Sequence, residues 1–570
     1  MSPRRRRSLQ RQPLLAAFAL LALAALAPAQ PPSGPAGRAD DEDALFRGIE
    51  VTRWDDPHTR PDTYAEYLAA RARHALDAPF AAEVVYVSPP GIYAGTQRID
   101  MLVASPLETA LEPELTQYAQ DLEAEGWGVV IWKCTGGTPP EVRAFLQGRR
   151  AEAQILGSMM IGDLPVAWYE MDDDFNNTHS EFPSDLYYMD LDGTFGDGDQ
   201  DGKFDSHDVS PTGDQRPEIF LGRLRASPLA GTWGTEVELL RNYFAKVHAY
   251  RAGTLSAPRQ ALAFQDDDWY TMATEQAKAY ATVVTVSDKY ETTAANYQAR
   301  LLESYHSVVV CAHSSPSGHS FKVPASSGGS LSNTALWALD PPGLFYNLFA
   351  CSNARYTSTR YMGGVYIFVK STGLIAVGTT KTGSMLSFGD YYASLGRHDT
   401  FGEAFRSWFA RRWPYSLTAR RWFYGMTLLG DPTLRIRQAS LAADYTSAGP
   451  GQGFTVDFAL DGRPDRAGDP YVILASQTGT SPGFPVPATR VPLVFDTVTW
   501  FFLFALNGPA FPNSCATLDA AGQARARLRH AGPIPPALLG HELHFSALLS
   551  DARTLGFRAA TPPATVKLVE

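Results

Sequence analysis

A thiol and an imidazole stand at the ends of two short apolar runs of this sequence. The valine-rich run at 307–312 leads to His313, and the aromatic-rich run at 344–350 leads to Cys351. Both runs have the length, composition and polar boundaries of buried β-strands. Chemistry in an open parallel sheet takes place at the carboxyl ends of the strands, so we expect the two side chains to meet at one edge. A thiol beside an imidazole is the nucleophile and base of a cysteine enzyme.

The chemistry expected of this pair is acyl transfer. A thiol with an ordinary pKa of about 8.5 is mostly protonated at neutral pH, so the imidazole must accept its proton or lower its pKa. The same imidazole then protonates the leaving amine. The backbone N–H groups of Cys351 and of Ser314, the residue after His313, are the predicted donors to the carbonyl oxygen. Two alternatives stay open: Cys351 is an inert buried thiol, or it forms a disulfide with Cys311.

The segments around these residues resemble the gingipain-type cysteine peptidases of the caspase-like clan. The resemblance extends over about residues 95–437, and it lies in the order and spacing of several motifs. They are His313-Ser314-Ser315-Pro316, Phe349-Ala350-Cys351-Ser352-Asn353, the closing stretch Met426–Leu434, and the upstream stretches Ile161–Pro165 and Ser184–Tyr188. The resemblance implies a cysteine peptidase in which the second of two adjacent α/β units carries the nucleophile. The residue at the Ser314 position is normally glycine in that family, and serine is strained there if the loop needs a positive φ.

Three consecutive acidic residues, Asp266–Asp268, follow the predicted strand at 260–264 and reach the same sheet edge. The resemblance implies an acidic residue near the histidine, and we favour Asp266 as the side chain that orients His313. Two other interpretations stay open: the three residues form a solvated turn that caps the next helix, or they bind a basic substrate side chain and select Lys or Arg before the cut bond. His319 is the rival base, but its place in a Pro/Gly turn predicts a solvated loop histidine.

The loop from 197 to 208 has the oxygen spacing of a calcium-binding loop. Ca²⁺ takes roughly six to eight oxygens, and a twelve-residue loop offers them from alternate positions, with a glycine at the sixth. Here Gly202 is that glycine. The predicted ligands are Asp197, Asp199, Asp201, the Lys203 carbonyl, Asp205 and Asp208. Because the last position is Asp and not Glu, and no long helices flank the loop, we expect a structural calcium ion of modest affinity.

The first 29 residues have the pattern of a secretory signal peptide. Arg4–Arg7 precede an apolar stretch at 14–26 and a small-residue cleavage site before Gln30. This stretch is too short to span a bilayer, and no later stretch approaches the ~18 apolar residues of a membrane helix. The formal net charge of −11 becomes −16 without the five arginines of this segment, which argues against nucleic acid or an anionic membrane as a partner. Four cysteines are too few for a disulfide scaffold.

Strand and helix signals alternate from residue 99 to residue 437, which predicts an α/β fold of two adjacent caspase-like subdomains with mainly parallel sheets. The expected organisation is a leader at 30–94, a first subdomain at 95–252 with the calcium loop, a catalytic subdomain at 253–437 and a β-sandwich at 438–570. The expected function is a secreted cysteine endopeptidase that acts on protein or peptide substrates. The alternative is a catalytically inactive, calcium-stabilised surface or adhesion protein on the same fold. The oligomeric state is left open.

Overall fold

The structure is a computed structural model that describes residues 60–72, 78–89 and 97–569, apart from short gaps. These gaps fall at 325, 398, 437–438, 450, 463–465, 481–482, 487–488, 535, 537–538, 553–555 and 562. The predicted signal peptide at 1–29 lies outside the described residues, as does the leader up to residue 59. Among the helices that are described, none is long and apolar enough to cross a membrane.

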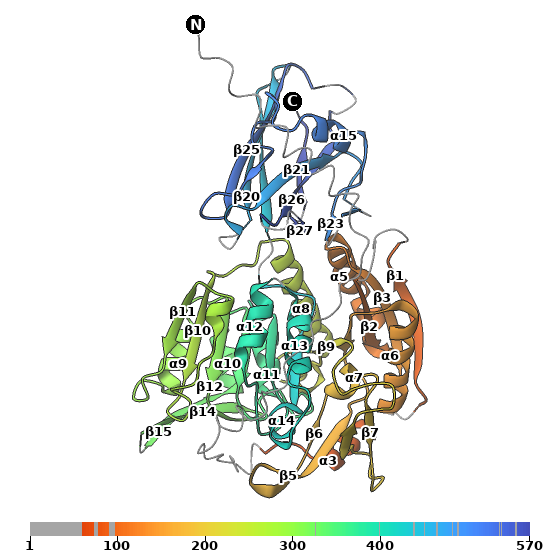
Figure 1. Ribbon diagram of the computed structural model, residues 1–570, viewed down its shortest axis with the longest axis vertical. Helices are drawn as coiled ribbons and strands as arrows, with labels where there is room; N and C mark the ends of the chain where they lie inside the picture. Colours follow the sequence, from red (N-terminus) through yellow and green to blue (C-terminus); the bar gives the residue numbers. More distant parts are fainter. Residues whose placement is uncertain are drawn as a thin grey trace.

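One eleven-stranded sheet runs through the α/β part of the chain (Figure 1). In order across the sheet, the strands are β1 (Ala81–Val87), β3 (Gly128–Thr135), β2 (Arg98–Ala104), β4 (Gly157–Ile161), β9 (Phe220–Leu224), β18 (Met426–Gly430), β17 (Ile375–Thr379), β16 (Phe345–Phe349), β12 (Ser307–Cys311), β10 (Gln260–Gln265) and β11 (Thr282–Val286). Pairing is parallel within each half, whereas β1 is antiparallel to β3 and β18 is antiparallel to β17. The predicted fold class, α/β with mainly parallel pairing, is confirmed.

The two predicted α/β subdomains share this sheet and do not carry one sheet each. The pair Leu429–Arg223 joins β18 to β9 and makes the sheet continuous. β1 also belongs to the sheet, which therefore begins inside the stretch predicted as a leader. The loops after β9 and β16 contact each other, since the Tyr361 hydroxyl donates to the Arg225 carbonyl at 2.8 Å. We call the side of the sheet where these loops meet the carboxyl edge.

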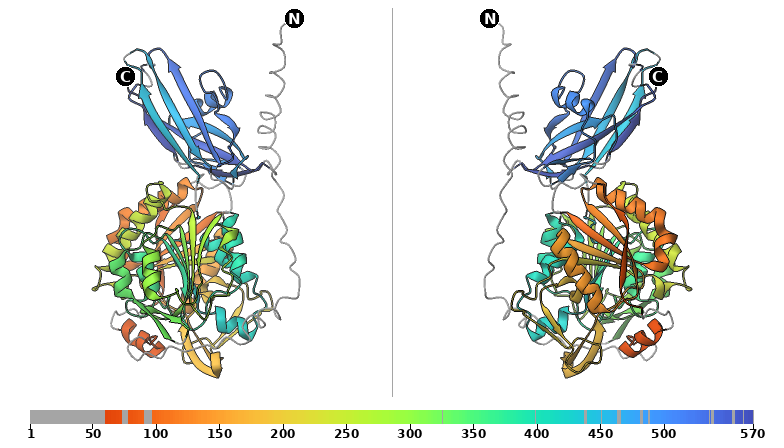
Figure 2. Two further views of the ribbon diagram at one scale, coloured as in Figure 1. Left: turned by 90° about the vertical axis from the view of Figure 1, so that its left-hand side faces the viewer. Right: turned by 90° about the vertical axis from the view of Figure 1, so that its right-hand side faces the viewer.

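Helices cover both faces of the sheet (Figure 2). They are α5 (Glu112–Ala124), α6 (Pro139–Ala153), α8 (Glu236–Arg251), α9 (Ala294–Leu301), α10 (Asn333–Leu339), α11 (Met362–Phe368), α12 (Phe388–Gly396), α13 (Phe401–Ala410) and α14 (Leu417–Phe423). Because both faces are covered, six of the central strands are buried at every residue, and this is why they are continuous apolar runs in the sequence. A capping box of Thr138 and Glu141 stands at the start of α6.

Short elements surround the carboxyl edge, at the lower end of Figure 1. They are α3 (Tyr64–Ala72), the hairpins β5–β6 (Trp168–Asp174 and Thr178–Pro183) and β7–β8 (Thr194–Gly196 and Ser206–Asp208), the turn η2 (Phe175–Asn177), α7 (Leu186–Met189), and the three-stranded sheet of β13 (His313–Ser315), β14 (Gly318–Val323) and β15 (Ser326–Ser332). Two of these elements, η2 and β13, contribute Phe175 and His313 to the candidate site.

The chain after residue 438 forms two larger antiparallel sheets and the two-stranded antiparallel sheet of β22 (Phe484–Val486) and β23 (Thr489–Val491). One of the larger sheets contains β19 (Ser440–Ser447), β20 (Gly453–Asp461) and β25 (Gln523–Ala531); the other contains β24 (Cys515–Thr517), β21 (Pro470–Ser476), β26 (Glu542–Ser550), β27 (Phe557–Ala560) and β28 (Ala564–Lys567). Phe458 of the first sheet packs on Phe545 of the second, with ring centroids 4.8 Å apart. Two facing antiparallel sheets are the arrangement expected of a sandwich.

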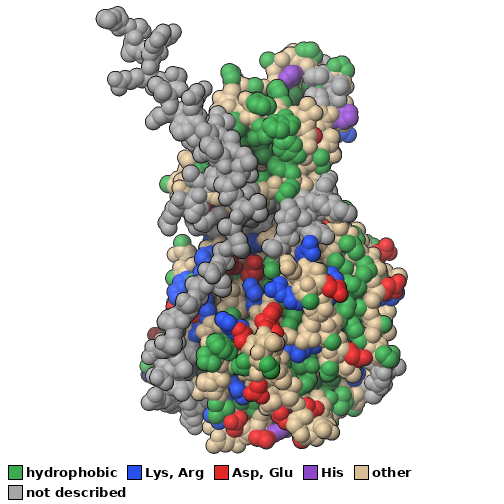
Figure 3. Space-filling view, turned by 45° about the vertical axis from the view of Figure 1, so that its right-hand side comes forward, with side chains coloured by type: hydrophobic (Ala, Val, Ile, Leu, Met, Phe, Trp, Pro, Cys, Tyr) green, Lys and Arg blue, Asp and Glu red, His purple; other side chains and the backbone are tan. Residues whose placement is uncertain are grey.

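A short helix in this C-terminal part, α15 (Thr497–Phe504), has no counterpart in the sequence prediction. Almost all of its residues are apolar, so no amphipathic period marks it. It leaves Phe501 and Phe504 exposed, by 66% and 84%. Figure 3 shows hydrophobic side chains on the face of the C-terminal part and many charged side chains on the α/β part.

Candidate active site

The register of the sheet brings His313 and Cys351 together. Cys311 of β12 is paired with Phe349 of β16, and each candidate lies two residues beyond its member of that pair. Both side chains line one pocket at the carboxyl edge. In one detail the structure differs from the prediction: His313 does not end the β12 run but starts the short strand β13.

The chain turns sharply directly after Cys351. Ser352 has a φ of 56°, in the left-handed region that non-glycine residues rarely adopt, and its N–H donates to the Lys381 carbonyl at 2.8 Å. Such a turn presents the preceding side chain at the end of the strand, and strained backbone of this kind gathers at functional sites. Cys351 is a partly buried free thiol and Cys311 a fully buried one, so the two do not form the disulfide considered as an alternative.

The thiol of Cys351 favours its protonated form at rest. Burial raises its pKa, although the Gly383 N–H and the charge of Lys381 act in the opposite direction. Lys381 is itself buried in an ion pair with Asp174, with 2.8 Å between Nζ and Oδ1. The nucleophile therefore needs a base to remove its proton, because no neighbour holds it as a thiolate.

The base candidate is held by Asp268 and not by the predicted Asp266. The Oδ2 atom of Asp268 lies 2.6 Å from His313 Nε2, and its Oδ1 atom accepts a bond from Lys322 Nζ at 2.7 Å. Although burial favours the neutral acid, the contacts with Lys322 and His313 lower the pKa of Asp268. An ionised carboxylate on Nε2–H leaves Nδ1 as the basic nitrogen of the imidazole.

Asp266 has a different environment although it is only two residues away. Its backbone N–H donates to the Cys311 carbonyl at 3.0 Å, and its Oδ1 accepts the Asp268 N–H at 3.2 Å. Its Oδ2 has no hydrogen-bond partner among the described residues. Burial, together with the charge of Asp268, raises the pKa of Asp266 to about 8. Asp266 is thus a buried acid that keeps its proton at neutral pH and does not contact the imidazole.

His319 is a core residue and not the solvated loop histidine that its turn-like sequence predicted. It lies on β14, where its Nε2 contacts the Tyr366 hydroxyl at 2.8 Å and its Nδ1 the Ser314 hydroxyl at 3.3 Å. Burial lowers its pKa to about 3, so it stays neutral. The prediction failed because the β13–β14–β15 sheet folds back onto the protein, which the local sequence does not indicate.

Ser314, the predicted second donor to the carbonyl oxygen, lies in β13 opposite His319 of β14. It is not among the residues with a positive φ, so serine replaces glycine here without left-handed strain. Its hydroxyl donates to the Gly318 carbonyl at 3.2 Å. The departure from the family pattern is therefore accommodated by an ordinary strand conformation.

Sequence reasoning missed Lys381 and the aromatic residues of the pocket. Lys381 follows β17 at the carboxyl edge, as His313 and Cys351 follow β12 and β16, so the same strand-end rule could have indicated it. The pocket is completed by residues that no local pattern connects. They are Phe175, Trp269, Ala312, Phe349, Ala350, Thr382, Gly383 and Trp422.

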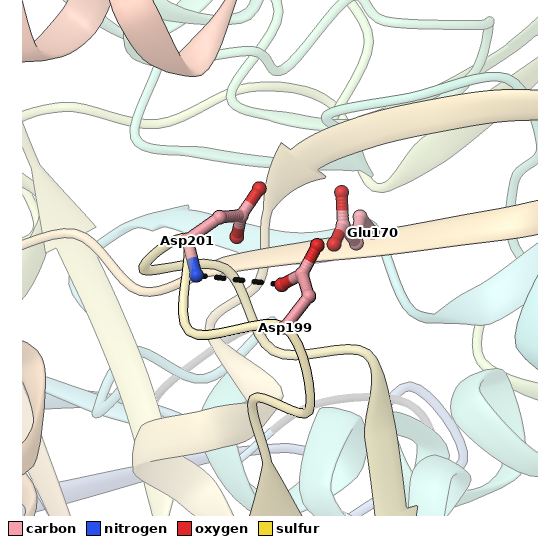
Figure 4. Close-up of side chains that lie close together, drawn as sticks. All are labelled: Glu170, Asp199 and Asp201. Carbon is pink, nitrogen blue, oxygen red and sulfur yellow. Dashed lines mark hydrogen bonds between the residues drawn. The ribbon is translucent and has the colours of Figure 1, made fainter.

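The predicted calcium loop is the tip of the β7–β8 hairpin, and the structure regroups its acids. The carboxylates of Asp199 and Asp201 come together with that of Glu170, with ligand atoms within 4.8 Å of one another (Figure 4). Among the described residues, the other predicted ligands do not join this group. Asp197 instead accepts the Gly202 N–H at 3.0 Å.

The other predicted ligands have separate roles in the loop. Asp205 Oδ2 accepts the Gly198 N–H at 2.8 Å, and Asp208 belongs to β8. The Nζ atom of Lys203 lies 2.7 Å from Asp201 and 2.6 Å from Glu170. The ammonium group thus supplies part of the positive charge that a cation would bring.

Comparison with known proteins gives three findings. The model of peptidase family C25 matches residues 139–437. Among solved structures, dimeric latent PorU from Porphyromonas gingivalis is similar to this chain at 12% identity and a TM-score of 0.30, with 83% of this chain and 42% of that chain covered. The chain thus spans less than half the length of that protein. A search of curated proteins gives no match. Because the family match covers just over half of the chain and includes the thiol, the imidazole and the strands between them, this chain belongs to peptidase family C25, the gingipain-type cysteine peptidases.

Proposed function

We propose that this protein is an exported cysteine endopeptidase in which Cys351 attacks the scissile carbonyl and His313 acts as base and then as acid. The observation that carries the proposal is the shared pocket of the two side chains, with Asp268 2.6 Å from the far nitrogen of the imidazole. A nucleophile, a base and a carboxylate that orients the base make up a complete acyl-transfer set.

The reaction begins from the protonated thiol that burial favours. As the sulfur bonds to the carbonyl carbon, Nδ1 of His313 takes the thiol proton, and the carboxylate of Asp268 stabilises the imidazolium that forms. The backbone N–H groups of Cys351 and Ser314 are the proposed donors to the oxyanion. When the C–N bond breaks, the imidazolium protonates the leaving amine. Water then attacks the thioester with His313 as base, which releases the acid and restores the thiol.

No observation favours the alternative of an inactive surface protein. Its main support was serine in place of glycine at position 314, and that serine has an ordinary strand conformation. Export is proposed from the signal-peptide pattern of residues 1–29. N-terminal sequencing of the secreted protein should then give a first residue of Gln30.

The test uses the purified mature protein, casein, and variants of two thiols. Cys351→Ala should abolish internal cleavage of casein, whereas Cys515→Ala, which removes a partly buried thiol of the C-terminal part, should leave it intact. Treatment with a thiol alkylator should inactivate the wild type and label Cys351. His313→Ala should also abolish cleavage with an unchanged melting temperature. Casein cleavage at the wild-type rate by Cys351→Ala would overturn the mechanism.

We further propose a structural calcium ion at the β7–β8 tip. Carboxylate oxygens are the ligands that Ca²⁺ prefers, and Glu170, Asp199 and Asp201 are close enough to share one ion. Lys203 must then yield its contacts with Glu170 and Asp201, so the affinity should be weak. None of the three acids lines the pocket of Cys351, so the ion is proposed to have no part in the reaction.

A further inference from the structure

The pocket beside Cys351 has a wall of connected aromatic rings. Trp269 contacts Phe349 with ring centroids 4.8 Å apart, Phe349 lies 5.9 Å from Trp422, and Trp422 lies 5.0 Å from Phe175. The four rings come from three loops or helices and one strand of the carboxyl edge. A substrate side chain that enters this space therefore meets hydrocarbon surface, which favours apolar groups.

The lining of this pocket contains no carboxylate and no lysine or arginine. Two acids close to the lining residues are paired with other groups. Asp174 is paired with Lys381 at 2.8 Å, and Asp268 with His313 at 2.6 Å and Lys322 at 2.7 Å. A lysine or arginine side chain in the pocket would find no partner for its charge among the lining residues, and the burial of an unpaired charge is strongly unfavourable.

The same contacts bear on the interpretation of Asp266–Asp268 as a pocket for a basic side chain. Asp268 contacts the imidazole, and Asp266 is fully buried, with its backbone N–H bonded to the Cys311 carbonyl. None of the three acids Asp266–Asp268 is part of the pocket lining. Nothing in the lining therefore favours a lysine or arginine side chain over an apolar one.

We propose, on the basis of the peptidase function proposed above, that this pocket receives the substrate side chain on the amino side of the cut bond and selects an uncharged apolar one. Because Cys351 itself lines the pocket, a side chain bound there belongs to a residue next to the attacked carbonyl.

The test compares fluorogenic peptides that are identical except at that position, where they carry Leu, Val, Phe, Lys, Arg or Glu. The wild-type protein should cleave the best apolar peptide with a kcat/KM about a hundredfold or more above that of the charged peptides. The variant Thr382→Asp places a carboxylate in the lining. It should lower the ratio of kcat/KM for the apolar peptide to kcat/KM for the Lys and Arg peptides at least tenfold. Its melting temperature and its labelling by a thiol alkylator report whether it is folded.

A second measurement separates this inference from the proposed function. Peptidyl chloromethyl ketones that end in Leu or Lys are incubated with the protein, and the labelled residue is identified by mass spectrometry. Faster labelling of Cys351 by the leucine reagent supports the pocket assignment. Cys351-dependent cleavage with equal rates, or with a preference for Lys or Arg, overturns the assignment and leaves the peptidase function in place. No cleavage of any peptide and no label on Cys351 overturns both.

Discussion

Two parts of the carboxyl edge hold buried or partly buried carboxylates, and they differ in what meets them. In the first half, Asp185 accepts hydrogen bonds from Arg223 at 2.5 Å, Thr427 at 2.6 Å and Tyr356 at 2.9 Å, and both ionic groups are buried. In the second half, Asp268 is met by an imidazole and a lysine, and its side chain is 23% exposed. The ion pair of Asp185 and Arg223 is fully buried, whereas Asp268 contacts His313, which lines the pocket of Cys351.

The difference lies in whether the partner of the carboxylate can exchange a proton near neutral pH. The arginine guanidinium stays protonated at every pH at which proteins are folded, and its planar array of N–H donors holds the carboxylate in one geometry. An imidazole gives and takes a proton near neutral pH, so the same acid beside it can stabilise a charge that appears during a reaction. We therefore expect matched substitutions in the two places to act on different quantities.

The largest expected effect is on turnover. Asp268→Asn keeps the shape of the side chain but removes the charge that stabilises the imidazolium, so kcat should fall by about two to four powers of ten. The melting temperature should change little, because Asp268 is partly exposed. Steady-state kinetics on one good peptide gives the result. A kcat within threefold of wild type would mean that His313 does not depend on this contact.

The matched change in the first half should act on stability. Asp185→Asn leaves the buried Arg223 guanidinium without its counter-charge, which costs on the order of 3–5 kcal/mol of unfolding free energy. The kcat of the molecules that remain folded should stay near the wild-type value. Thermal unfolding measures the loss.

A double variant sharpens this second prediction. Arg223→Met removes the stranded charge, so Asp185→Asn combined with Arg223→Met should unfold at a higher temperature than Asp185→Asn alone. If the double variant were the less stable of the two, the cost would not come from an unpaired guanidinium.

A third effect, and one that depends on pH, is expected at Asp266. Its pKa is raised to about 8 in the folded protein, chiefly by burial, so between about pH 4 and pH 8 the folded state holds a proton that the unfolded state has lost. Stability from this group is therefore complete at low pH and is lost as the pH rises through about 8. Asp266→Asn should remove this decline and stabilise the protein at pH 9 by up to about 5 kcal/mol. Melting temperatures from pH 5 to pH 9 test it; parallel curves for variant and wild type would contradict it.

The contrast between Asp266 and Asp268 also marks how far the sequence alone could lead. His313 and Cys351 were predictable, because each follows a run of buried residues and parallel strands place such ends side by side. The sequence could not show which of Asp266 and Asp268 contacts the imidazole. This depends on how the chain leaves β10, where the Asp266 N–H still bonds to the Cys311 carbonyl and turns its side chain inward.

In the fold, too, sequence patterns predicted the local elements but not the contacts between segments far apart in the chain. Alternating strand and helix signals predicted the parallel α/β fold, but they could not show that β18 joins both halves into one sheet through Leu429 and Arg223. His319 was misjudged because Tyr366, which buries it, lies 47 residues away in the sequence. Glu170 was missed at the calcium loop because it comes from the β5–β6 hairpin.

The smallest expected effect is at the calcium loop. The question there is whether its carboxylates are fully satisfied by Lys203 or can still bind a cation. If Lys203 satisfies Glu170 and Asp201 as Arg223 satisfies Asp185, the loop is closed and calcium adds nothing. If the set is open to a cation, calcium at about ten times its Kd should stabilise the protein by roughly 1.4 kcal/mol. We expect the second result: EDTA should lower the melting temperature by a few degrees, and millimolar Ca²⁺ should restore it.

Variants on either side of the ion test this expectation. Asp199→Asn with Asp201→Asn should erase the calcium response, whereas Asp172→Asn, a highly exposed acid on the neighbouring β5, should keep it. Lys203→Met should strengthen the response, because the ammonium group competes with the ion for Glu170 and Asp201. The calcium site would be rejected if the melting temperature of the wild type and of Lys203→Met did not respond to EDTA or calcium and the purified protein contained no metal. Lys203 would then satisfy these acids as Arg223 satisfies Asp185.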